Sequence, residues 1–435
     1  MKRTMVFLAA LLLAVISAAA QDVNPEFLAA LRENPFRAGV NTCPYEGGPY
    51  ADTPAPKGYK AFYISHYGRH GSRSNWDGRT YMHLISTLEK ADAEKLLTAD
   101  GKTLLDVTRQ CLERHNGMDG RLTPRGTREH RGIAERMYAR FKRVFKKEGG
   151  NIRVISSMVP RCLISMTAFT DRLTELDPSL EISWDVGETY QQYIDPRVPG
   201  EYTRPAMRTL MEIGRLPVDS VAYMSRFFSD PVKAFGLVDR FARFESEVFA
   251  VARITASFDI PTDIMPMLPE ESIYNEWLSG NAYVYMGHAN SLVSGNLRMA
   301  PAGLTVADIV SKADAVIAGE NVAADLRFGH DFPFVALCSY FGLEGVGAKL
   351  SAREVPVKWF GSDYTPFAAN LQLIFYSSKS GGDVLVKFLL NERETLISGL
   401  EPAQGPYYRW NDVKNWLAGR REVFEASVRE WKENN

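Results

Sequence analysis

Along this chain, segments in which hydrophobic and polar positions alternate every two residues are followed by segments with a helical period of about 3.6 residues. The first kind of segment predicts strands and the second predicts helices. The run "KAFYISHYG", residues 60–68, alternates like a half-buried strand and leads into a glycine-punctuated basic loop. A buried strand is predicted at 151–157, "NIRVISS", directly before a helical pattern at 160–176. Residues 324–343, "ADLRFGHDFPFVALCSYFGL", repeat this order. Strands that alternate with helices indicate an α/β sheet.

The segment at 121–145, "RLTPRGTREHRGIAERMYARFKRVF", contains a strong helix start. Thr123 is the candidate N-cap and Pro124 stands at the first helical position, where its missing N–H costs nothing. Ile133, Met137 and Phe141 then fall on one helical face. This segment is therefore predicted to form an amphipathic helix.

Near the end of the chain the pattern predicts a hairpin and a closing helix. "AANLQLIFYSS" at 368–378 and "VLVKFLLNE" at 384–392 flank the turn-like "KSGGD", whose Gly-Gly suits a tight connection. An amphipathic helix is expected from about 412 to 432. Residues 21–58, rich in Pro and Gly, are expected to be extended.

The middle of the chain has a different pattern. Residues 177–312 show helical periodicity joined by Pro-rich connections such as "DIPTDIMPMLPEE". We therefore predict an α/β core made of 21–176 and 313–435, with 177–312 as a mainly helical insertion subdomain. The expected fold class is α/β, with a central, mostly parallel sheet flanked by helices.

The first residues, "MKRTMVFLAALLLAVISAAAQ", show the basic start, short apolar run and small residues of a secretory signal peptide. Cleavage is expected near Ala20, so that 1–20 would be removed and the protein exported, with the periplasm favoured over full secretion. No later segment is apolar for long enough to span a bilayer, so no membrane span is expected in the mature chain.

Composition limits the partners that the protein can have. Lysine plus arginine, 51 in total, nearly cancels aspartate plus glutamate, 52 in total, which argues against a nucleic-acid binder and makes any anion recognition local. Oligomeric state is left open. Disulfide pairing also stays open, because the four cysteines, Cys43, Cys111, Cys162 and Cys338, allow three pairings. Cys162 and Cys338 lie in apolar helical patterns, where buried free thiols are an alternative at least as good as bridges.

Positive charge gathers in the loop after the first predicted strand, in "YISHYGRHGSRSNWDGR", residues 63–79. A loop at the carboxyl end of a strand is where open α/β sheets bind ligands. Arg69 and Arg73 offer planar forks suited to phosphate oxygens, and Gly71 lets the backbone approach closely. At an effective dielectric near 20, one ion pair about 4 Å apart contributes about 4 kcal/mol. The loop therefore predicts an anion site.

A metal site is the alternative, because His66 and His70 are four residues apart, as in helical zinc sites. Gly68 between the two histidines and the strand pattern before them disfavour a helix. Two neighbouring arginines would also repel a cation. We expect no metal here and interpret His66 as a support on the strand.

Four segments together resemble the histidine acid phosphatases, the family that includes phytases, glucose-1-phosphatases and multiple inositol polyphosphate phosphatases. "RHGSR" at 69–73 resembles the R-H-G-x-R signature, although Asn75 replaces its usual trailing proline. "RLTPRGTREH" resembles the L-T-x-x-G segment, "VISSMVPRCLISMTAF" the segment with the third phosphate-binding arginine, and "FGHDFPFVAL" the distal His-Asp motif.

The resemblance implies a phosphoglycerate mutase-like fold, no metal and no other cofactor, with a small-molecule phosphomonoester as the partner. It makes His70 the nucleophile and Asp331 the acid that protonates the leaving group; the phosphate ligands it implies are Arg69, Arg73, Arg161 and His330. Nearby arginines are expected to depress the pKa of His70, and a bound phosphate dianion to raise that of Asp331.

Other residues are candidates for contacts with the rest of the substrate. Asn75, Trp76 and Arg79 follow the signature closely, and a packed Trp and a solvated Arg are their alternatives. His288, in "MGHANSL", lies in a motif one residue away from the His-Ala-Glu of the inositol polyphosphate phosphatases, but Asn290 cannot act as an acid. His288 is therefore expected either to line the pocket or to make a local hydrogen bond.

The leading hypothesis is an exported, metal-independent phosphomonoester hydrolase that acts through a phosphohistidine, with phytate or other inositol polyphosphates as candidate substrates. A phosphatase for sugar phosphates such as glucose 1-phosphate, or one of broad specificity, would use the same machinery. A non-catalytic phosphate-binding or scaffold protein is disfavoured, because His70 and Asp331 are both present.

Overall fold

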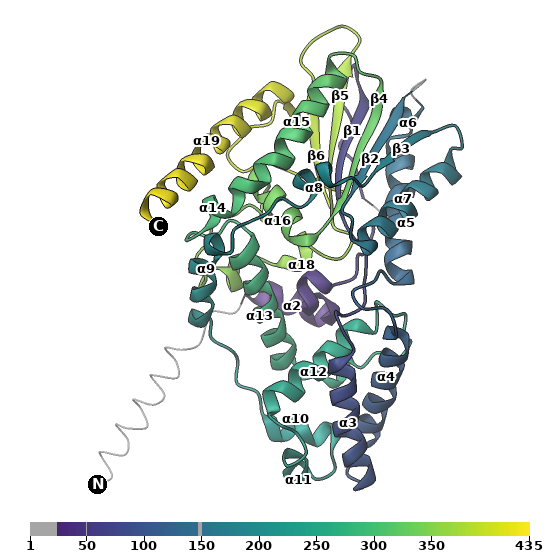
Figure 1. Cartoon of the computed structure of the whole chain (residues 1–435), viewed down its shortest axis with the longest axis vertical. Helices are drawn as coiled ribbons and strands as arrows, with labels where there is room; N and C mark the ends of the chain where they lie inside the picture. The colour runs from purple at the N-terminus through teal and green to yellow at the C-terminus, as the bar shows by residue number, and fades with distance from the viewer. Residues whose placement is uncertain (1–23, 49, 147–149) are drawn as a thin grey trace.

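The computed structural model describes residues 24–48, 50–146 and 150–435, and its centre is an eight-stranded sheet (Figure 1). The strand order is β3-β2-β4-β1-β5-β6-β7, with β8 paired to β6. The predicted signal peptide lies outside the described residues. The strands are β1 (Tyr59–Arg69), β2 (Asn151–Ser156), β3 (Glu181–Asp185), β4 (Val322–Gly329), β5 (Asn370–Ser378), β6 (Leu385–Leu390), β7 (Arg393–Thr395) and β8 (Tyr407–Arg409).

The sheet has a parallel half and an antiparallel half. β1, β4, β2 and β3 run parallel to their neighbours, whereas β5 pairs with β1 and β6 with β5 in antiparallel register. The β5–β6 connection is the predicted hairpin, and Gly381 and Gly382 in its turn have positive φ. The α/β class is confirmed, but the sheet is partly rather than mostly parallel, because β5 pairs antiparallel with β1 and the hairpin then makes β6 antiparallel to β5.

Helices cover both faces of the sheet (Figure 1). On one face the packed helices are α5 (Pro124–Arg140), α6 (Lys142–Phe145) and α7 (Pro160–Leu176); on the other they are α15 (Gly303–Ile317), α16 (Asp331–Phe341) and α19 (Trp410–Asn434). Strand residues alternate between the two resulting cores, with Tyr63 in one and Ile64 in the other. The amphipathic helix predicted after Thr123 and the closing helix are both confirmed.

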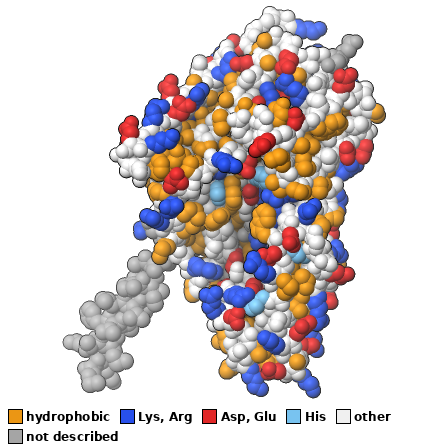
Figure 2. All heavy atoms as spheres, viewed as in Figure 1, with side chains coloured by type: hydrophobic (Ala, Val, Ile, Leu, Met, Phe, Trp, Pro, Cys, Tyr) orange, Lys and Arg blue, Asp and Glu red, His pale blue; other side chains and the backbone are white. Residues whose placement is uncertain are grey.

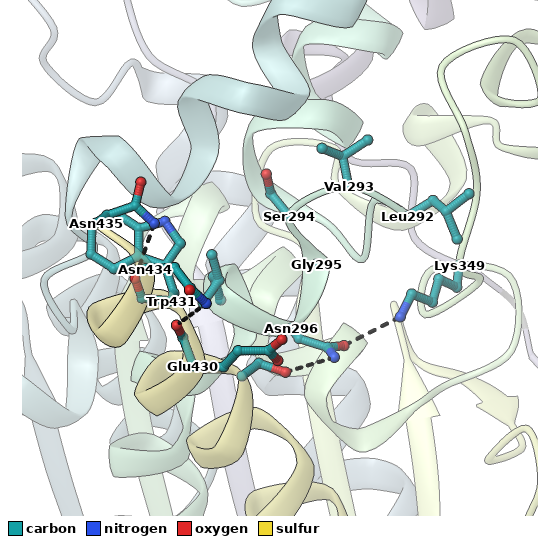
Figure 3. Close-up of a pocket in the computed structure, with 12 residues that line it drawn as sticks. Leu292, Val293, Ser294, Gly295, Asn296, Lys349, Glu430, Trp431, Asn434 and Asn435 are labelled. Carbon is teal, nitrogen blue, oxygen red and sulfur yellow. Dashed lines mark hydrogen bonds between the residues drawn. The ribbon is translucent and has the colours of Figure 1, made fainter.

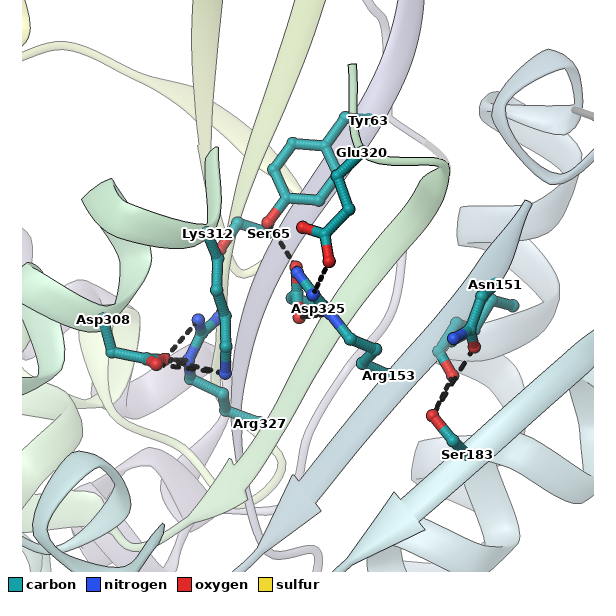
Figure 4. Close-up of polar contacts among 11 residues, drawn as sticks. Tyr63, Ser65, Asn151, Arg153, Ser183, Asp308, Lys312, Glu320, Asp325 and Arg327 are labelled. Atoms are coloured by element: carbon teal, nitrogen blue, oxygen red, sulfur yellow. Dashed lines mark hydrogen bonds and ion pairs between the residues drawn. The ribbon is translucent and has the colours of Figure 1, made fainter. Parts of the chain in front are cut away.

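A network of buried charges joins α15 to the strands (Figure 4). Arg327 on β4 donates from Nε to Asp308 Oδ2 at 2.8 Å, and Asp325, two residues earlier, accepts from Tyr63 Oη at 2.7 Å and from Arg153 Nε at 2.8 Å. Each of these charges has a partner of opposite sign, which buried charges need in order to be tolerated. The network holds the middle of β4 in place, immediately before the segment that carries the His-Asp motif.

A helical portion lies below the sheet in Figure 1. It contains α3 (Arg79–Ala93), α4 (Ala99–His115), α10 (Ser220–Phe227), α11 (Pro231–Phe235) and α12 (Phe241–Ile254), while α13 (Glu270–His288) runs from it toward the sheet. Helices α3 and α4 pack against α10 and α12 although they precede residue 177 in the chain. The proposed division into 21–176, 177–312 and 313–435 stays a prediction.

One local expectation was wrong, and one short strand was not predicted. Residues 25–42 are helical, not extended, in α2 (Pro25–Glu33) and η1 (Pro35–Thr42), because Asn24 and Asn34 each cap a helix that begins with proline. The helical middle of the chain also contains the exposed edge strand β3. The remaining short elements are α8 (Glu188–Ile194), α9 (Gly200–Arg208), η2 (Thr209–Glu212), η3 (Met265–Met267), α14 (Gly295–Met299), η4 (Ala300–Ala302), α17 (Val355–Lys358) and α18 (Gly361–Tyr364).

The four cysteines are all buried free thiols. Among the described residues, no helix is both long and apolar enough to cross a membrane.

Candidate active site

The central strands bring the R-H-G-x-R loop and the His-Asp motif, which are distant in sequence, to the carboxyl ends of β1 and β4. β1 and β4 are parallel neighbours, and Arg69, the last residue of β1, pairs with Gly329, the last residue of β4. The His70 N–H donates to the Gly329 carbonyl at 3.0 Å, and the rings of His70 and His330 lie 5.7 Å apart. Ligands of α/β sheets bind at such carboxyl ends. The sheet topology therefore makes one site of segments 260 residues apart in sequence.

His70 is held in one orientation at this edge. Its Nδ1 lies 3.0 Å from the Gly71 carbonyl, which can only accept, so the proton belongs on Nδ1 and Nε2 keeps its lone pair. The pKa of His70 is well below its usual value, chiefly because the ring is buried and secondarily because Arg69 and Arg161 are close. In the sequence only the arginines indicated a lowered pKa for His70, whereas burial is the larger cause in the structure. Both causes keep the imidazole neutral at acid pH.

Two arginines of the signature loop, residues 69–73 at the end of β1, lie on either side of His70 in the sequence. Arg69 is fully buried; its Nη1 donates to the carbonyls of Thr365 and Pro366, and its Nη2 lies 3.0 Å from Asp331 Oδ2. Arg73 donates to the Ser74 carbonyl at 2.7 Å and leaves its buried Nε without a partner. Burial and the neighbouring Arg69 lower the pKa of Arg73 to about 9, so it is still cationic at neutral pH.

Arg161 and His330 meet from two helix starts. Arg161 lies in the first turn of α7, and its Nη2 is 3.2 Å from His330 Nδ1. His330 caps α16, and its Nε2 lies 3.0 Å from Ser157 Oγ. Burial, followed by the charge of Arg161, lowers the pKa of His330 to about 4. A guanidinium at a helix N-terminus is unfavourable by itself, which is consistent with an anion between these groups.

Asp331 faces the same space. Its Oδ2 accepts from Asn41 Nδ2 at 2.8 Å, and its Oδ1 accepts from the Phe332 N–H at 3.0 Å. Burial acts to raise the pKa of Asp331, but Arg69, Arg73 and the Asn41 hydrogen bond together hold it below its usual value. The carboxyl group is therefore ionised in the free pocket, and the rise expected for a phosphate complex would start from this lowered pKa.

The signature loop is anchored to α5. Glu129 accepts from the Ser72 N–H and the Ser72 hydroxyl, both at 2.7 Å, and from the Tyr45 N–H at 3.1 Å. A Cβ on Gly71 would lie 2.5 Å from the Gly126 carbonyl oxygen. The small size of Gly71 thus permits close approach of the loop to the first turn of α5, whereas the sequence suggested close approach of a ligand.

Two adjoining chambers open beside these groups. We name the first, of about 370 Å³, the catalytic chamber; it is lined by His70, Arg73 and Arg253 among others. The second, of about 500 Å³, is the outer chamber, lined by residues that include His330, Asp195 and Arg298. Both share one wall, formed by Trp76, Arg161, Asp331 and Phe332. In Figure 2, histidine side chains lie in a hollow near the middle of the face, with basic and acidic side chains beside them.

The candidate substrate contacts fall in different places. Asn75 lines the catalytic chamber, and its side chain donates to Tyr81 Oη at 2.8 Å. Trp76 is 62% exposed, and its ring lies 3.9 Å from the guanidinium carbon of Arg73 and 5.0 Å from that of Arg161. Arg79 instead forms an exposed ion pair with Asp77 and lines neither chamber.

His288 lies at the end of α13 and lines the outer chamber. Its ring stacks on Phe332 with centroids 3.4 Å apart and an interplanar angle of 9°. Burial lowers the pKa of His288 to about 3, so the ring is neutral. The structure therefore places His288 on the pocket wall, one of the two positions that the sequence left open.

Sequence reasoning missed three arginines of the chambers: Arg197 and Arg298 in the outer chamber and Arg253 in the catalytic one. Arg253 on α12 donates to Thr42 Oγ1 at 2.8 Å and lines the catalytic chamber, and Arg298 on α14 lines the outer one. The available signal was weak: Arg253 interrupts the apolar run "VFAVARI" and Arg298 stands in "GNLRMA". Nothing in either segment relates it to the phosphatase motifs.

Two further features bear on the chemistry. Within the described ranges, no cluster of three or more His, Cys, Asp or Glu side chains is arranged to hold a metal ion, and His66 packs between the rings of Phe169 and Phe328.

A separate pocket of about 300 Å³ lies between residues 292–297 and the end of α19 (Figure 3). Its charged lining residues are Lys349 and Glu430, so it lacks the excess of cations found in the two chambers.

Comparison with known proteins supports the fold. The sequence matches no family model and no curated protein. The structure is similar to the multiple inositol polyphosphate phosphatase of Bifidobacterium longum in complex with phosphate, with TM-score 0.72 and 18% identity over 88% of this chain and 98% of that one. It is also similar to the D. castellii phytase, with TM-score 0.67 and 13% identity over 89% and 86% of the two chains.

The Hafnia alvei phytase in complex with tartrate matches with TM-score 0.53 and 11% identity over 84% of this chain and 98% of that one. These proteins are histidine acid phosphatases, and the chain has their fold. The resemblance found in the sequence motifs is thus confirmed at the level of the fold. Of these three structures, the inositol polyphosphate phosphatase has the highest TM-score.

Proposed function

We propose that this protein is a phosphomonoester hydrolase that acts through a phosphohistidine at His70. One arrangement carries the proposal: a neutral imidazole with a free Nε2 lies among arginines, of which Arg69 is fully buried, at the same end of the sheet as Asp331. An imidazole of this kind is a competent nucleophile, and fixed guanidinium groups stabilise the charge on a transferring phosphoryl group.

In the first step, Nε2 of His70 attacks phosphorus and the bond from phosphorus to the ester oxygen breaks. Arg69, Arg73 and Arg161 hold the non-bridging oxygens, with His330 beside Arg161. Asp331 gives its proton to the leaving alkoxide. The lowered pKa of Asp331 in the free pocket requires that the substrate dianion offset the arginines and so return a proton to the carboxyl group.

In the second step, water attacks phosphorus and the bond from Nε2 to phosphorus breaks. The carboxylate of Asp331, now deprotonated, takes a proton from that water, and inorganic phosphate leaves. His70 is again a neutral imidazole, since its low pKa disfavours uptake of a proton. The cycle uses side chains of the signature loop and of the His-Asp motif together with Arg161 on α7, and needs no metal.

Inositol polyphosphates such as phytate are the substrate class that we propose. Six arginines line or border the two chambers: Arg69, Arg73, Arg161, Arg197, Arg253 and Arg298. A monophosphate would use only some of them, and the fold similarity to an inositol polyphosphate phosphatase and to phytases supports the same class. We also propose that the protein is exported after removal of 1–20, in keeping with the signal-peptide pattern.

Hydrolysis of p-nitrophenyl phosphate by the wild type, with and without EDTA, tests the reaction class. We expect equal activity in both, and in His70→Ala a fall of about a thousandfold or more, because the attacking atom is lost. Rapid quenching into alkaline denaturant should reveal an added phosphoryl group on wild-type protein and none on the variant. Activity that EDTA abolishes would exclude the metal-free mechanism, and full activity in His70→Ala would exclude the nucleophile.

A further inference from the structure

Asn41 contacts the active site in a way that the proposed reaction does not use. It lies in η1, outside the four segments that resemble the histidine acid phosphatases, and it lines the catalytic chamber. Its Nδ2 donates to Asp331 Oδ2 at 2.8 Å, and its carbonyl accepts from Arg69 Nη1. One residue of the N-terminal segment thus contacts both the proposed acid and the arginine beside it.

The backbone that carries Asn41 is strained and tightly packed. Val40, the preceding residue, has φ 50° and ψ −107°, and positive φ is a genuine outlier for a β-branched residue. Val40 is 1% exposed, and a Cβ on Gly361 would lie 2.7 Å from its Cγ1. A strained residue persists only where its surroundings determine its conformation. The position of Asn41 is therefore fixed by the packing of Val40 against this glycine.

The two oxygens of the Asp331 carboxyl group have different surroundings. Oδ1 accepts from the Phe332 N–H at 3.0 Å, whereas Oδ2 faces Asn41 Nδ2 at 2.8 Å and Arg69 Nη2 at 3.0 Å. Among the described residues, Asn41 is the one whose contact with Oδ2 has hydrogen-bond geometry. A proton on Oδ2 would compete with the Asn41 N–H and would face the charge of Arg69. Oδ1 is therefore the better position for the acidic proton.

Resting on the proposed function, we infer that Asn41 is a positioning residue for the acid step. It holds Oδ2 as a hydrogen-bond acceptor, so that the acidic proton of Asp331 sits on Oδ1 and passes from there to the leaving alkoxide. Without the Asn41 amide, the carboxyl group loses the hydrogen bond that sets its orientation, and its proton is divided between the two oxygens. Less of the acid then presents its proton in the productive geometry.

The same hydrogen bond also affects when Asp331 is protonated. Burial raises the pKa of this carboxyl group, whereas Arg69, Arg73 and then Asn41 lower it. A variant without the Asn41 amide should therefore hold the acidic proton up to a higher pH, although it transfers that proton less efficiently. The other charged or titratable groups around Asp331 are unchanged in such a variant: Arg69, Arg73, Arg161, Asp195, His288 and His330.

The dependence of kcat on pH and on the leaving group tests the positioning role. We expect Asn41→Leu, which has no donor, to lower kcat for glycerol 2-phosphate about tenfold on its acidic plateau, the usual effect of one hydrogen bond to a charged group. Hydrolysis of p-nitrophenyl phosphate should fall much less, because its leaving group needs no proton. The alkaline limb for glycerol 2-phosphate should move to higher pH, because it reports the loss of the Asp331 proton in the complex.

Asn275→Ser is the matched control. The Asn275 side chain bonds both backbone groups of Leu216, at 2.8 and 2.9 Å, and it lines neither chamber. Its loss should lower stability without separating the two esters or moving the alkaline limb. Asn41→Ser, whose side chain is too short to reach Asp331, replaces Asn41→Leu if the leucine variant does not fold. Equal losses for both esters, or an unmoved alkaline limb, would overturn the positioning role.

Infrared difference spectra on binding of inorganic phosphate separate this inference from the proposed function, because they need no turnover. The wild type should gain the carbonyl stretch of a protonated carboxyl group, and Asp331→Asn should not. In Asn41→Leu the band should move to higher frequency, because Oδ2, as the carbonyl oxygen, loses a hydrogen bond. No band in the wild type, or a band that Asn41→Leu leaves in place, would contradict the inference. The expected shift in a protein that hydrolyses no phosphomonoester would refute the proposed function alone.

Discussion

The protonation of Asp331 depends on what occupies the pocket. Burial alone would favour the neutral acid, but Arg69, Arg73 and Asn41 favour the carboxylate in the free protein. A phosphate dianion reverses that balance, since it neutralises the same guanidinium groups and adds negative charge close to Asp331. In the proposed mechanism, binding of the substrate therefore protonates Asp331 and so creates the acid that the reaction requires.

Asp331→Asn should affect substrates according to their leaving groups. Hydrolysis of an alkyl phosphate should fall by about 10² to 10⁴, because a poor leaving group needs a proton. Hydrolysis of p-nitrophenyl phosphate should fall much less, because p-nitrophenolate leaves without one. Steady-state kcat for both esters measures the difference. Equal losses for both would show that Asp331 does not act as the acid.

At the scale of elements, α5 positions the signature loop. The carboxylate of Glu129 joins Ser72 in the loop to Tyr45 in the N-terminal segment, and the backbone of Gly126 touches Gly71 directly. One buried acceptor and one close backbone contact thus join the loop to α5, in addition to the hydrogen bonds that the loop forms with Ser165 and Thr123. Neither group faces the substrate, so their effect on the reaction passes through the position of His70.

Glu129→Gln should destabilise the protein by about 1 to 3 kcal/mol, because an amide cannot accept all the hydrogen bonds that the carboxylate accepts. Urea unfolding measures this loss, and kcat for p-nitrophenyl phosphate should fall with it. Glu135→Gln on the exposed side of α5 is the control, since Glu135 is largely exposed and forms an ion pair with the partly exposed Arg172. Similar stabilities for the two variants would mean that Glu129 does not anchor the loop.

At the scale of the whole molecule, buried histidines make the fold sensitive to acid. His66 and His130 are each about 1% exposed, and burial lowers the pKa of both to about 3. Between that value and their ordinary pKa near 6.5, the unfolded chain binds protons that the folded chain does not. The stability that each neutral ring contributes is thus complete above pH 6.5 and is lost progressively as pH falls toward 3.

We expect the free energy of unfolding to decrease below pH 6.5 by up to about 1.4 kcal/mol per pH unit for each of these histidines. His130→Gln should show a shallower decrease between pH 6 and 4, whatever its stability at pH 7. Chemical denaturation across this range measures the slope. An unchanged slope in the variant would show that His130 does not contribute to acid sensitivity.

Comparison of sequence and structure shows which features are local. The helix after Thr123, the closing hairpin and the strand-to-helix units follow from periodicity and turn residues within short windows, and all were predicted. The helices at 25–42 were missed because each depends on a single Asn-Pro cap in a segment of weak periodicity. The strand β3 was missed because a short, exposed edge strand has little hydrophobic alternation.

The sequence by itself determined the chemistry of the two motifs, because each is contiguous: a histidine and arginines in one loop, and a His-Asp pair at one helix start. It also determined the α/β class, since repeated strand-to-helix order leaves few other ways to bury the apolar faces. Only the tertiary structure decided that β1 and β4 are neighbours, and hence that His70 and Asp331 share a pocket. It alone added Arg253 and Arg298, because long-range packing rather than local pattern places a buried arginine on a cavity wall.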